Sequence, residues 1–377
     1  MPTTGVRIHT IKNEEIMKHI VCFHLYNDYS GSPKVLKMVL EGMLKRGYRI
    51  DLVTSRGGVL DELQGAANLS IHHWPYRFSR HAAVTMARYA LAQVATFCIA
   101  LRWALSRDTV FYINTLLPVG PALAGRLTGK RVVYHYHENA FVKGAFYRML
   151  AAAMQRLAHE IVCVSQYQAS FLRRKEKVTM VANALTGEFA ARLRPNAEAA
   201  FGRRTVLMLS SLKAYKGTKE FIELAKRMPE YRFVLVINDR QERIDQYLAD
   251  NWLTRSTNLT IYPRQDDVTR FYNEASVVVN LSDRRRFIET FGLTALEAMT
   301  AGLPVIVPPV GGIAEMVEDG KNGFHIDVRK PEELERRIRE MLTDRLTYVH
   351  MAHCALQEAK RYDGRRMTAR IMEIING

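Results

Sequence analysis

The sequence lacks paired cysteines and a leader-like N-terminus, and each absence excludes a class of protein. Only four of the 377 residues are cysteine, and no two of them form a CxxC pair of the kind that zinc sites use. The segment MPTTGVRIHTIKNEEIM has no apolar core and no small-residue cleavage site, so we do not expect it to be a secretory signal. We expect residues 1–17 to be a disordered lead-in, and the cysteines to be free thiols in a reducing compartment.

The sequence also lacks an uncharged apolar run of about 18 residues, the length that a membrane-spanning helix requires. The nearest approach is His81–Leu105, which carries Arg88 and Arg102 with only 13 residues between them. That stretch is too short to cross about 30 Å of hydrocarbon. We expect a helix that packs in the core or lies on a membrane surface, in a protein that is soluble or peripheral.

Familiar phosphate and metal motifs are absent as well. The chain has no GxGxxG, and Gly125–Lys130 is one residue too short for a P-loop and is not followed by Ser or Thr. His135 and His137 share one face of a predicted strand, but no nearby sequence supplies further metal ligands. We therefore expect no metal site.

The composition is that of a globular protein, with 48% hydrophobic and 24% charged residues, but its charge is unbalanced. Lys and Arg number 54 against 38 Asp and Glu, for a net charge of +16. Residues 1–190 hold 24 of the basic and 12 of the acidic residues, so this half carries +12 and the rest carries +4. So basic a surface predicts an anionic partner: nucleic acid, a membrane surface or phosphorylated small molecules.

Short apolar runs alternate with helix-like segments, which is typical of βα units and parallel sheets. The segment Thr186–Arg203 is polar, contains Pro195 and has no strand pattern, so we interpret it as a linker between two doubly wound α/β domains. The strands expected before it are His19–Leu25, Arg49–Thr54, Leu69–Trp74, Thr109–Ile113, Arg131–His137, Glu160–Val164 and Val178–Val181. Those expected after it are Thr205–Leu209, Arg232–Ile237, Leu259–Ile261, Ser276–Leu281, Pro304–Val307 and Gly323–Ile326.

These patterns predict domains over residues 18–190 and 191–360, with 361–377 forming a C-terminal helix that could pack back on the first domain. Two such domains facing each other leave a cleft. Ligands of doubly wound sheets bind at the carboxyl ends of the strands, where helix N-termini point.

The segment Ile288–Pro304 (IETFGLTALEAMTAGLP) follows a predicted strand and leads into a helix. Thr290 could cap that helix, and Gly292 lets the backbone approach a ligand closely. The amides of Phe291, Gly292 and Leu293 would then point out of the helix N-terminus and form an anion site.

Glu289 and Glu297 lie eight residues apart in the same segment, so both can project toward one side of the helix. Two carboxylates beside an anion site could hold hydroxyls of two sugar rings, one on each side of a diphosphate. The spacing alone fits incidental surface glutamates equally well.

The pattern Glu289-x-Phe-Gly-Leu-x-x-x-Glu297-Ala-Met, followed by Gly302-x-Pro304, resembles the E-x7-E signature of family 4 retaining glycosyltransferases. Gly311–Val317 and Asp319–Gly323 extend the match with the spacing that this family shows. The resemblance implies the GT-B fold, two Rossmann-like domains across a cleft, with a sugar nucleotide on the C-terminal domain. It implies that Glu289 contacts the donor sugar, Glu297 the ribose, and the Phe291–Leu293 amides the diphosphate.

The segment Ser210–Gly217 resembles the family's G-R-L-x-x-x-K-G, in which an arginine and a lysine clamp the diphosphate. Lys216 and Gly217 match, but Ser211 replaces the arginine, which removes a bidentate phosphate contact. Either Lys213 or the run Arg284–Arg286, with Arg286 nearest the donor, could restore the charge. A solvated turn is the alternative interpretation of that arginine run.

Three weaker matches lie in the first half. Gly31 and Ser32 follow the first strand where related sequences carry Gly-Gly, and Asn183 lies in Val-Ala-Asn-Ala before the linker. His137 matches a family histidine that faces the donor sugar, although a structural histidine is the alternative, and Glu138 is a candidate acceptor-side carboxylate. The predicted catalytic residues are Glu289, His137 and Lys216. The predicted donor-binding residues are Gly31, Ser32, Asn183, Ser211, Lys213, Arg286, Thr290, Phe291, Gly292, Leu293 and Glu297.

The resemblance implies a hexosyltransferase that retains anomeric configuration and uses a UDP- or GDP-linked sugar. No Asp-x-Asp occurs to hold Mg²⁺ or Mn²⁺, so no metal or other cofactor is expected. No side chain is an obvious nucleophile, which favours same-face substitution in which a leaving phosphate oxygen takes the acceptor proton.

The +12 half and its Arg-bearing apolar segment favour an anionic membrane surface as partner. They favour a bacterial cell-surface role on a lipid-linked or glycan acceptor, such as lipopolysaccharide, O-antigen, capsule or exopolysaccharide, at the inner face of the cytoplasmic membrane. The alternatives are a soluble sucrose- or glycogen-synthase-like transferase, a nucleotide-sugar epimerase, or a non-catalytic sugar-nucleotide binder. The chain carries no nucleic-acid-binding motif, so that partner is not expected.

Overall fold

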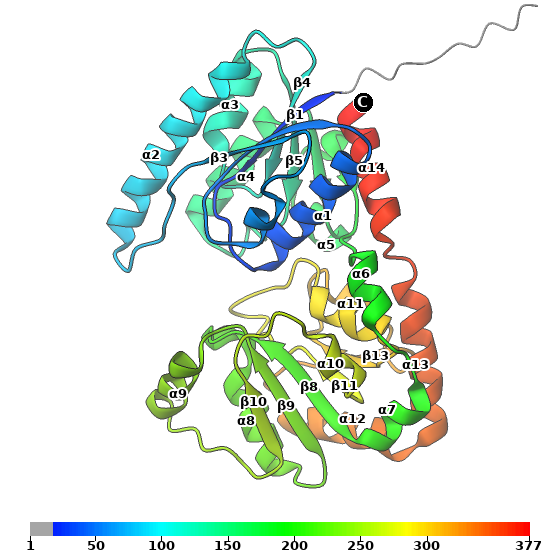
Figure 1. The fold of residues 1–377 in the computed structure, drawn as a ribbon. Coiled ribbons are helices and arrows are strands. Elements are labelled where there is room, and N and C mark those ends of the chain that lie inside the picture. The colour runs from blue at the N-terminus through cyan, green and yellow to red at the C-terminus, as the bar shows by residue number, and fades with distance from the viewer. Residues whose placement is uncertain (1–17) are drawn as a thin grey trace, which may run out of the picture.

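The computed structural model describes residues 18–377, and the predicted lead-in of residues 1–17 lies outside them. Two sheets form the centres of two domains, one above the other in Figure 1. The upper, N-terminal sheet has seven strands in the order β3-β2-β1-β4-β5-β6-β7, and the lower sheet has six in the order β10-β9-β8-β11-β12-β13. Neighbouring strands are parallel in both sheets. The expected fold of two doubly wound α/β domains is confirmed.

The strands agree with the predicted ones because buried parallel strands are continuous apolar runs that sequence reveals directly. In the N-terminal domain they are β1 (His19–His24), β2 (Arg49–Thr54), β3 (Leu69–His73), β4 (Thr109–Asn114), β5 (Arg131–Tyr136), β6 (Glu160–Cys163) and β7 (Val178–Met180). In the C-terminal domain they are β8 (Thr205–Ser210), β9 (Arg232–Ile237), β10 (Leu259–Tyr262), β11 (Val277–Val279), β12 (Val305–Val307) and β13 (Gly323–His325).

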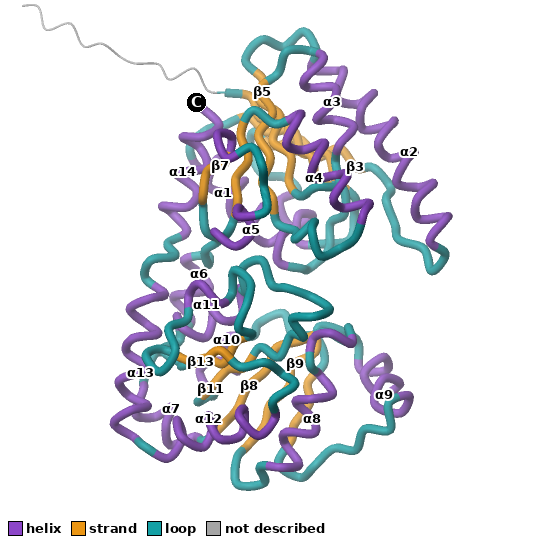
Figure 2. The backbone as a smooth tube through the Cα atoms, turned by 180° about the vertical axis from the view of Figure 1, so that it is seen from behind, coloured by secondary structure: helices purple, strands orange, loops and turns teal. Residues whose placement is uncertain are grey.

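Helices cover both faces of each sheet (Figures 1 and 2). Those of the first half are α1 (Gly31–Lys45), α2 (Ala82–Ala100), α3 (Val119–Leu127), α4 (Ala145–Leu157) and α5 (Gln166–Ser170). Those that follow are α6 (Gly187–Arg192), α7 (Ala197–Arg203), α8 (Thr218–Arg227), α9 (Gln241–Asp250), α10 (Thr269–Asn273), α11 (Leu293–Thr300), α12 (Pro331–Thr343), α13 (Arg345–Ala359) and α14 (Gly364–Asn376). The 3-10 turns are η1 (Val59–Leu63), η2 (Leu101–Trp103), η3 (Lys175–Lys177), η4 (Ala214–Lys216) and η5 (Ala314–Met316).

The segment Thr186–Arg203, interpreted as the linker, has no strand, but it contains the two short helices α6 and α7, which the sequence pattern did not reveal. Each begins at a side-chain cap: the Thr186 hydroxyl accepts from the Phe189 amide, and the Asn196 side chain accepts from the Ala199 amide. Helices of one to two turns bury too narrow a face to show the periodicity on which the prediction depends.

The C-terminal helix α14 packs on α1 in the N-terminal domain, where the red and blue helices lie side by side in Figure 1. Ile371 and Ile375 of α14 belong to the same buried cluster as Leu40 of α1. Gly42 permits this close approach, since a Cβ there would lie 2.3 Å from Thr368 Cγ2. The chain therefore crosses between the domains twice.

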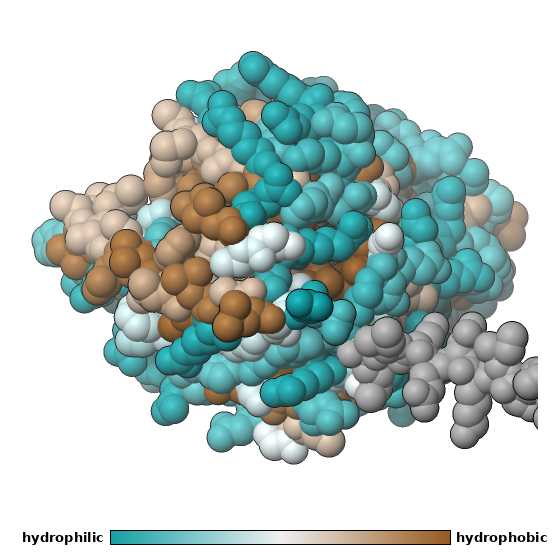
Figure 3. Space-filling view, turned by 90° about the horizontal axis from the view of Figure 1, so that it is seen from above, coloured by the Kyte–Doolittle hydropathy of each residue, from teal (hydrophilic) through white to brown (hydrophobic). Residues whose placement is uncertain are grey.

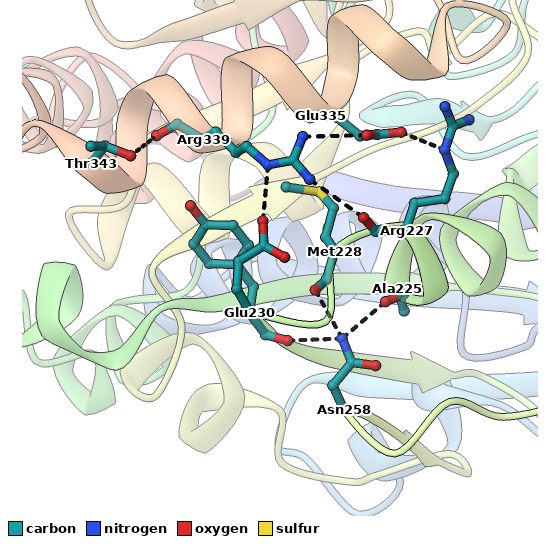
Figure 4. A network of polar contacts seen from close by, with 9 residues as sticks. Ala225, Arg227, Met228, Glu230, Asn258, Glu335, Arg339 and Thr343 are labelled. Carbon is teal, nitrogen blue, oxygen red and sulfur yellow. Dashed lines mark hydrogen bonds and ion pairs between the residues drawn. The ribbon is translucent and has the colours of Figure 1, made fainter.

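Two arginines of the C-terminal domain help to hold helices together (Figure 4). Glu335 of α12 forms an ion pair with Arg227 of α8 and accepts a hydrogen bond from Arg339, which also reaches Glu230 at 2.9 Å. Nearby, the Asn258 side-chain amide donates to three backbone carbonyls, those of Ala225, Met228 and Tyr231. Both arginines are paired with carboxylates, so their charges are used within the domain.

Candidate functional site: a polar cleft between the domains

A cleft of about 2470 Å³ separates the two domains and is lined by both. It lies at the carboxyl ends of the parallel strands, where the loops before α1 and α11 meet. Gly31 at the start of α1 faces Leu293 at the start of α11, and a Cβ on Gly31 would lie 3.3 Å from the Leu293 side chain. Two helix N-termini thus approach each other across the cleft and offer it unpaired amides.

Gly292 is the residue from which α11 starts. Its φ of 95° is left-handed, and a Cβ there would meet Ile313 at 2.4 Å, so only glycine fits. The predicted cap, Thr290, does not cap this helix. Its hydroxyl instead donates to the His137 carbonyl at 2.7 Å, a hydrogen bond that joins the two domains. The amides of Phe291–Leu293 remain beside the cleft, as expected.

Glu289 is a half-buried carboxylate held by a cation and a hydroxyl. Its Oε1 accepts from the Lys216 ammonium, and Ser282 Oγ donates to the same oxygen at 3.1 Å. Burial alone would raise the pKa of Glu289, but the Lys216 charge and these hydrogen bonds outweigh it and lower the pKa below its ordinary value. Glu289 is therefore an anion, poised to accept hydrogen bonds from hydroxyls.

Lys216 is positioned by aromatic rings and by a tight turn. Tyr215 and Phe287 stack with their centroids 4.6 Å apart, and the Lys216 ammonium lies 4.6 Å from the Phe287 centroid. Gly217, with φ of 73°, starts α8 directly behind it, and a Cβ there would lie 2.3 Å from the Leu281 carbonyl. The predicted Lys216-Gly217 pair thus places a fixed positive charge in the cleft beside Glu289.

Glu297 projects into the same cleft from within α11, and the Tyr272 hydroxyl donates to its Oε2. Burial raises the pKa of Glu297 above its ordinary value, although the Tyr272 hydrogen bond and the charge of Lys34 act in the opposite direction. Both glutamates thus line the cleft, Glu289 from the loop before α11 and Glu297 from within it, with pKa values shifted in opposite directions.

The N-terminal domain contributes Gly31, Ser32, His137, Glu138 and Asn183 to the cleft lining, each of them predicted. The side-chain oxygen of the buried Asn183 has no hydrogen-bond partner, so it is available to a ligand.

His137 and Glu138 follow β5 on the N-terminal side of the cleft. His137 Nε2 lies 3.0 Å from Asn114 Oδ1, and burial together with the neighbouring His135 and His24 holds the pKa of His137 well below its ordinary value. Burial raises the pKa of Glu138, whose Oε2 accepts from the Leu116 amide at 3.1 Å. His137 is thus a neutral hydrogen-bonding group and not a cation.

The structure distinguishes between the two candidates, Lys213 and the run Arg284–Arg286, for supplying the positive charge that is lost where Ser211 replaces the family arginine. Ser211 and Lys213 line the cleft, whereas none of Arg284–Arg286 does. Arg284 is paired with Asp327 at 2.7 Å, and Arg286 is exposed on the turn. The prediction that Arg286 contacts the donor is therefore not supported, and Lys213 is the cation that the fold places near Lys216.

Three residues around the glutamates were not singled out from sequence: Ser282, Tyr272 and Lys34. Ser282 precedes Glu289 by seven residues, and Lys34 belongs to the glycine loop that was identified, so local inspection could have found both. Tyr272 reaches Glu297 from 25 residues away, through the fold alone. Within residues 18–377, no three His, Cys, Asp or Glu side chains gather in a way that could hold a metal ion.

Comparison with known families matches both halves of the chain. Residues 29–186 match the model of Glycosyltransferase Family 4, and residues 191–358 match that of Glycosyl transferases group 1. Over 109 residues the chain is 34% identical to the sulfoquinovosyl transferase SQD2 of Arabidopsis thaliana, a match that covers 28% of this chain and 21% of that protein. The chain thus spans about a fifth of the length of that relative.

Two solved structures share the complete fold. The Anabaena protein HepE, in complex with UDP and glucose, superposes with a TM-score of 0.76 over 95% of this chain and 99% of its own, at 18% identity. WaaG, a glycosyltransferase involved in lipopolysaccharide biosynthesis, superposes with a TM-score of 0.70 over 95% of this chain and 100% of its own, also at 18% identity. At such identity the likeness concerns the fold.

Proposed function

Since this chain belongs to the family 4 glycosyltransferases of GT-B fold, we propose that it transfers a hexosyl group, with retained configuration, from a nucleoside diphosphate sugar. The observation that carries the proposal is the Glu289–Lys216 pair beside the amides that start α11, with Glu297 of that helix lining the same cleft. The complex of HepE with UDP and glucose supports a UDP-linked donor.

The arrangement matches the charges of such a donor. The α11 amides, Lys216 and Lys213 would meet the diphosphate, Glu289 the hydroxyls of the sugar, and Glu297 those of the ribose. As the bond between the anomeric carbon and the diphosphate breaks, the acceptor oxygen bonds to that carbon from the same face. The acceptor proton passes to the departing phosphate oxygen. The protein supplies position and charge stabilisation, and this scheme requires no metal ion.

The acceptor is proposed to be a lipid-linked or cell-surface glycan, such as lipopolysaccharide, O-antigen, capsule or exopolysaccharide. Two observations favour it: the +12 charge of the N-terminal half, which faces the acceptor in this fold, and the structural likeness to WaaG, which takes part in lipopolysaccharide biosynthesis. The enzyme would then work peripherally, at the inner face of the cytoplasmic membrane. A soluble sucrose- or glycogen-synthase-like transferase on the same fold is the second candidate.

Transfer and donor hydrolysis measured with a panel of UDP- and GDP-sugars test the proposal. We expect Glu289→Ala and Lys216→Ala each to reduce turnover by about 100-fold or more, since each removes charge stabilisation at the reacting centre. Glu318→Ala, which removes an exposed carboxylate paired only with Lys321, is the matched control and should leave turnover unchanged. Wild-type turnover in either cleft variant would refute the assignment. Nucleotide-sugar binding without transfer or hydrolysis would identify a non-catalytic binder, and conversion of the sugar of a nucleotide sugar into its epimer would identify an epimerase.

A further inference from the structure

The helix α2 is the least covered large element of the N-terminal domain. With the turn that follows, Ala82–Trp103 is long and apolar enough to span a bilayer by length and composition, yet only 22% of its most apolar stretch is buried. Both ribbon views place it at the outer edge of the domain (Figures 1 and 2). In the view from above, brown and tan side chains gather on that side of the molecule (Figure 3).

One stripe of α2 is committed to the protein. Tyr89, Ala92, Thr96 and Ala100 are buried at helical spacing. The Tyr89 hydroxyl donates to the Leu117 carbonyl at 2.9 Å, which fixes the helix beside α3. Gly120 of α3 permits close packing, because a Cβ there would lie 2.1 Å from the Gln93 carbonyl. This side of α2 cannot leave the domain without exposing its packed face, so α2 is not a separate membrane span.

The opposite stripe is apolar and uncovered. Leu91 and Val94 are 62% and 63% exposed, and Leu105 is 97% exposed. These positions belong to a row spaced alternately by three and four residues, which defines one continuous face of a helix. The outward stripe consists of Ala87, Leu91, Val94 and Cys98 of α2, continued by Leu101 and Leu105 in the turns that follow the helix. The neighbouring helix α3 adds exposed Leu123 and Leu127.

The surroundings of the stripe are basic. Between Glu62 and Glu138 the sequence has a single acidic residue, Asp108, against eight Lys and Arg. Arg88 and Arg102 of this segment are exposed beside the stripe. A second copy of the chain docking here through the same surface would bring like charges together, with Asp108 as the single carboxylate of the segment to pair them. An anionic lipid surface offers the complementary charge and an apolar interior at the same time.

We propose that the outward stripe of α2 inserts into the interface of an anionic bilayer and lies in its plane. The inference rests on the proposed function, which supplies the reason for a membrane-borne acceptor. The loop before α2 connects the two sites: exposed Phe78 packs on Tyr26, 4.8 Å between centroids, and Tyr26 leads into the cleft-lining residues Asp28 and Tyr29. An acceptor held in the bilayer would reach the cleft along this loop.

Flotation of the full chain with vesicles tests the mode of binding. We expect wild-type protein to bind vesicles of phosphatidylglycerol and phosphatidylcholine. Part of that binding should persist in 0.5 M NaCl, because salt screens charges (the Debye length falls to about 3 Å at about one molar salt) but does not weaken the insertion of apolar side chains. The vesicle affinity of the double variant Leu91→Gln/Val94→Gln should be lower by about tenfold or more, because the variant has lost inserted methylene and methyl groups. Arg88→Gln/Arg102→Gln should lose the preference for anionic over neutral vesicles.

Leu346→Gln is the matched control, because it removes a 76% exposed leucine from the C-terminal domain and should leave vesicle binding unchanged. Circular dichroism checks that each variant is folded. Wild-type vesicle binding by Leu91→Gln/Val94→Gln would overturn the proposal. The proposal would also be overturned if the wild-type protein sedimented as a dimer and this variant as a monomer, because a second copy of the chain would then cover the stripe. Titration with UDP-sugar keeps the two claims apart: vesicle binding without nucleotide binding supports this surface and refutes the proposed function.

Discussion

Glu289 precedes α11 and Glu297 lies within it, and the pKa values of the two carboxyls are shifted in opposite directions. A lysine and a serine hydroxyl hold Glu289, and they outweigh burial and lower the pKa of this carboxyl, whereas burial outweighs the Tyr272 hydroxyl and the charge of Lys34 and raises the pKa of Glu297. Glu289 is thus an anion down to acidic pH. Glu297 is the carboxylate that protonates first, and donor binding should follow its titration.

Donor affinity should therefore fall on acidification, and it should begin to fall at a pH above the pKa of an ordinary glutamate. A protonated Glu297 would accept hydrogen bonds from ribose hydroxyls less well. The Tyr272 hydrogen bond lowers the pKa of Glu297, so Tyr272→Phe should raise that pKa further and move the loss of affinity to higher pH. Calorimetric titration with a UDP-sugar between pH 4.5 and 8 measures the shift. Tyr348→Phe, which removes a buried hydroxyl bonded to the Ser276 carbonyl, should leave the profile in place.

The departure at Ser211 leads to a second expectation for single residues. Lys213 lines the cleft and Arg286 does not, so Lys213→Ala should weaken UDP-sugar binding by about tenfold, the value of one charge-assisted hydrogen bond of roughly 1.5 kcal/mol. Arg286→Ala should leave the affinity unchanged. The same titrations at pH 7 measure both. Equal losses in the two variants would show that the arginine turn folds over the bound donor.

At the scale of the elements, Asp51 joins three neighbouring strands. It lies on β2, and its two carboxylate oxygens contact His19 of β1 at 2.5 Å and His72 of β3 at 2.6 Å. Burial would raise the pKa of Asp51, but the hydrogen bonds with the two histidines outweigh it, so the pKa is lowered. A carboxyl whose pKa is lowered by folding stabilises the fold above its unfolded pKa, and that contribution disappears as the pH falls through the folded value.

Asp51→Ala should accordingly reduce the free energy of unfolding by about 2 kcal/mol at pH 7, because it removes a buried carboxylate from two half-buried histidines. The difference from wild type should shrink toward pH 3. Urea unfolding followed by tryptophan fluorescence measures it, since Trp74 and Trp103 report on this domain. Asp245→Ala is the control, because it removes a carboxylate from an exposed ion pair with Arg255. If this variant lost as much free energy of unfolding as Asp51→Ala, the role assigned to burial would be contradicted.

The elements also show what sequence can and cannot predict here. Strands such as Arg232–Ile237 were predicted with their observed bounds because a buried parallel strand is apolar throughout. Glu289 and Glu297 were both expected at the ligand site, and both line the cleft, although Glu289 lies in the loop before α11 and helical spacing does not relate the two. The role of Thr290 was missed because its partner, the His137 carbonyl, is 153 residues away. Arg284 was misjudged for the same reason, since it forms an ion pair with Asp327, which follows two further strands in the sequence.

At the scale of the whole molecule, polar contacts besides that of Thr290 join the two cleft walls. The Glu315 carboxylate of the C-terminal domain accepts from the backbone amides of Gln166 and Tyr167 in the N-terminal domain. On the other side of the cleft, the Arg264 guanidinium lies 3.7 Å from the ring centroid of Tyr29. The backbone crossings at Leu185 and Asp363 pair with each other and leave a narrow connection. Polar contacts of this kind are compatible with relative domain motion.

Glu315→Ala should therefore shift the population toward an open cleft. Its carboxylate is exposed, so each hydrogen bond is weak, and we expect a several-fold loss of the closed form together with an increased radius of gyration in small-angle scattering. A bound donor contacts both walls in the proposed function, so a saturating UDP-sugar should restore the compact form. Glu318→Ala, three residues away and paired only with Lys321, should scatter as wild type. An unchanged radius of gyration in Glu315→Ala, with and without donor, would mean that Thr290 and Arg264 are sufficient to keep the domains closed.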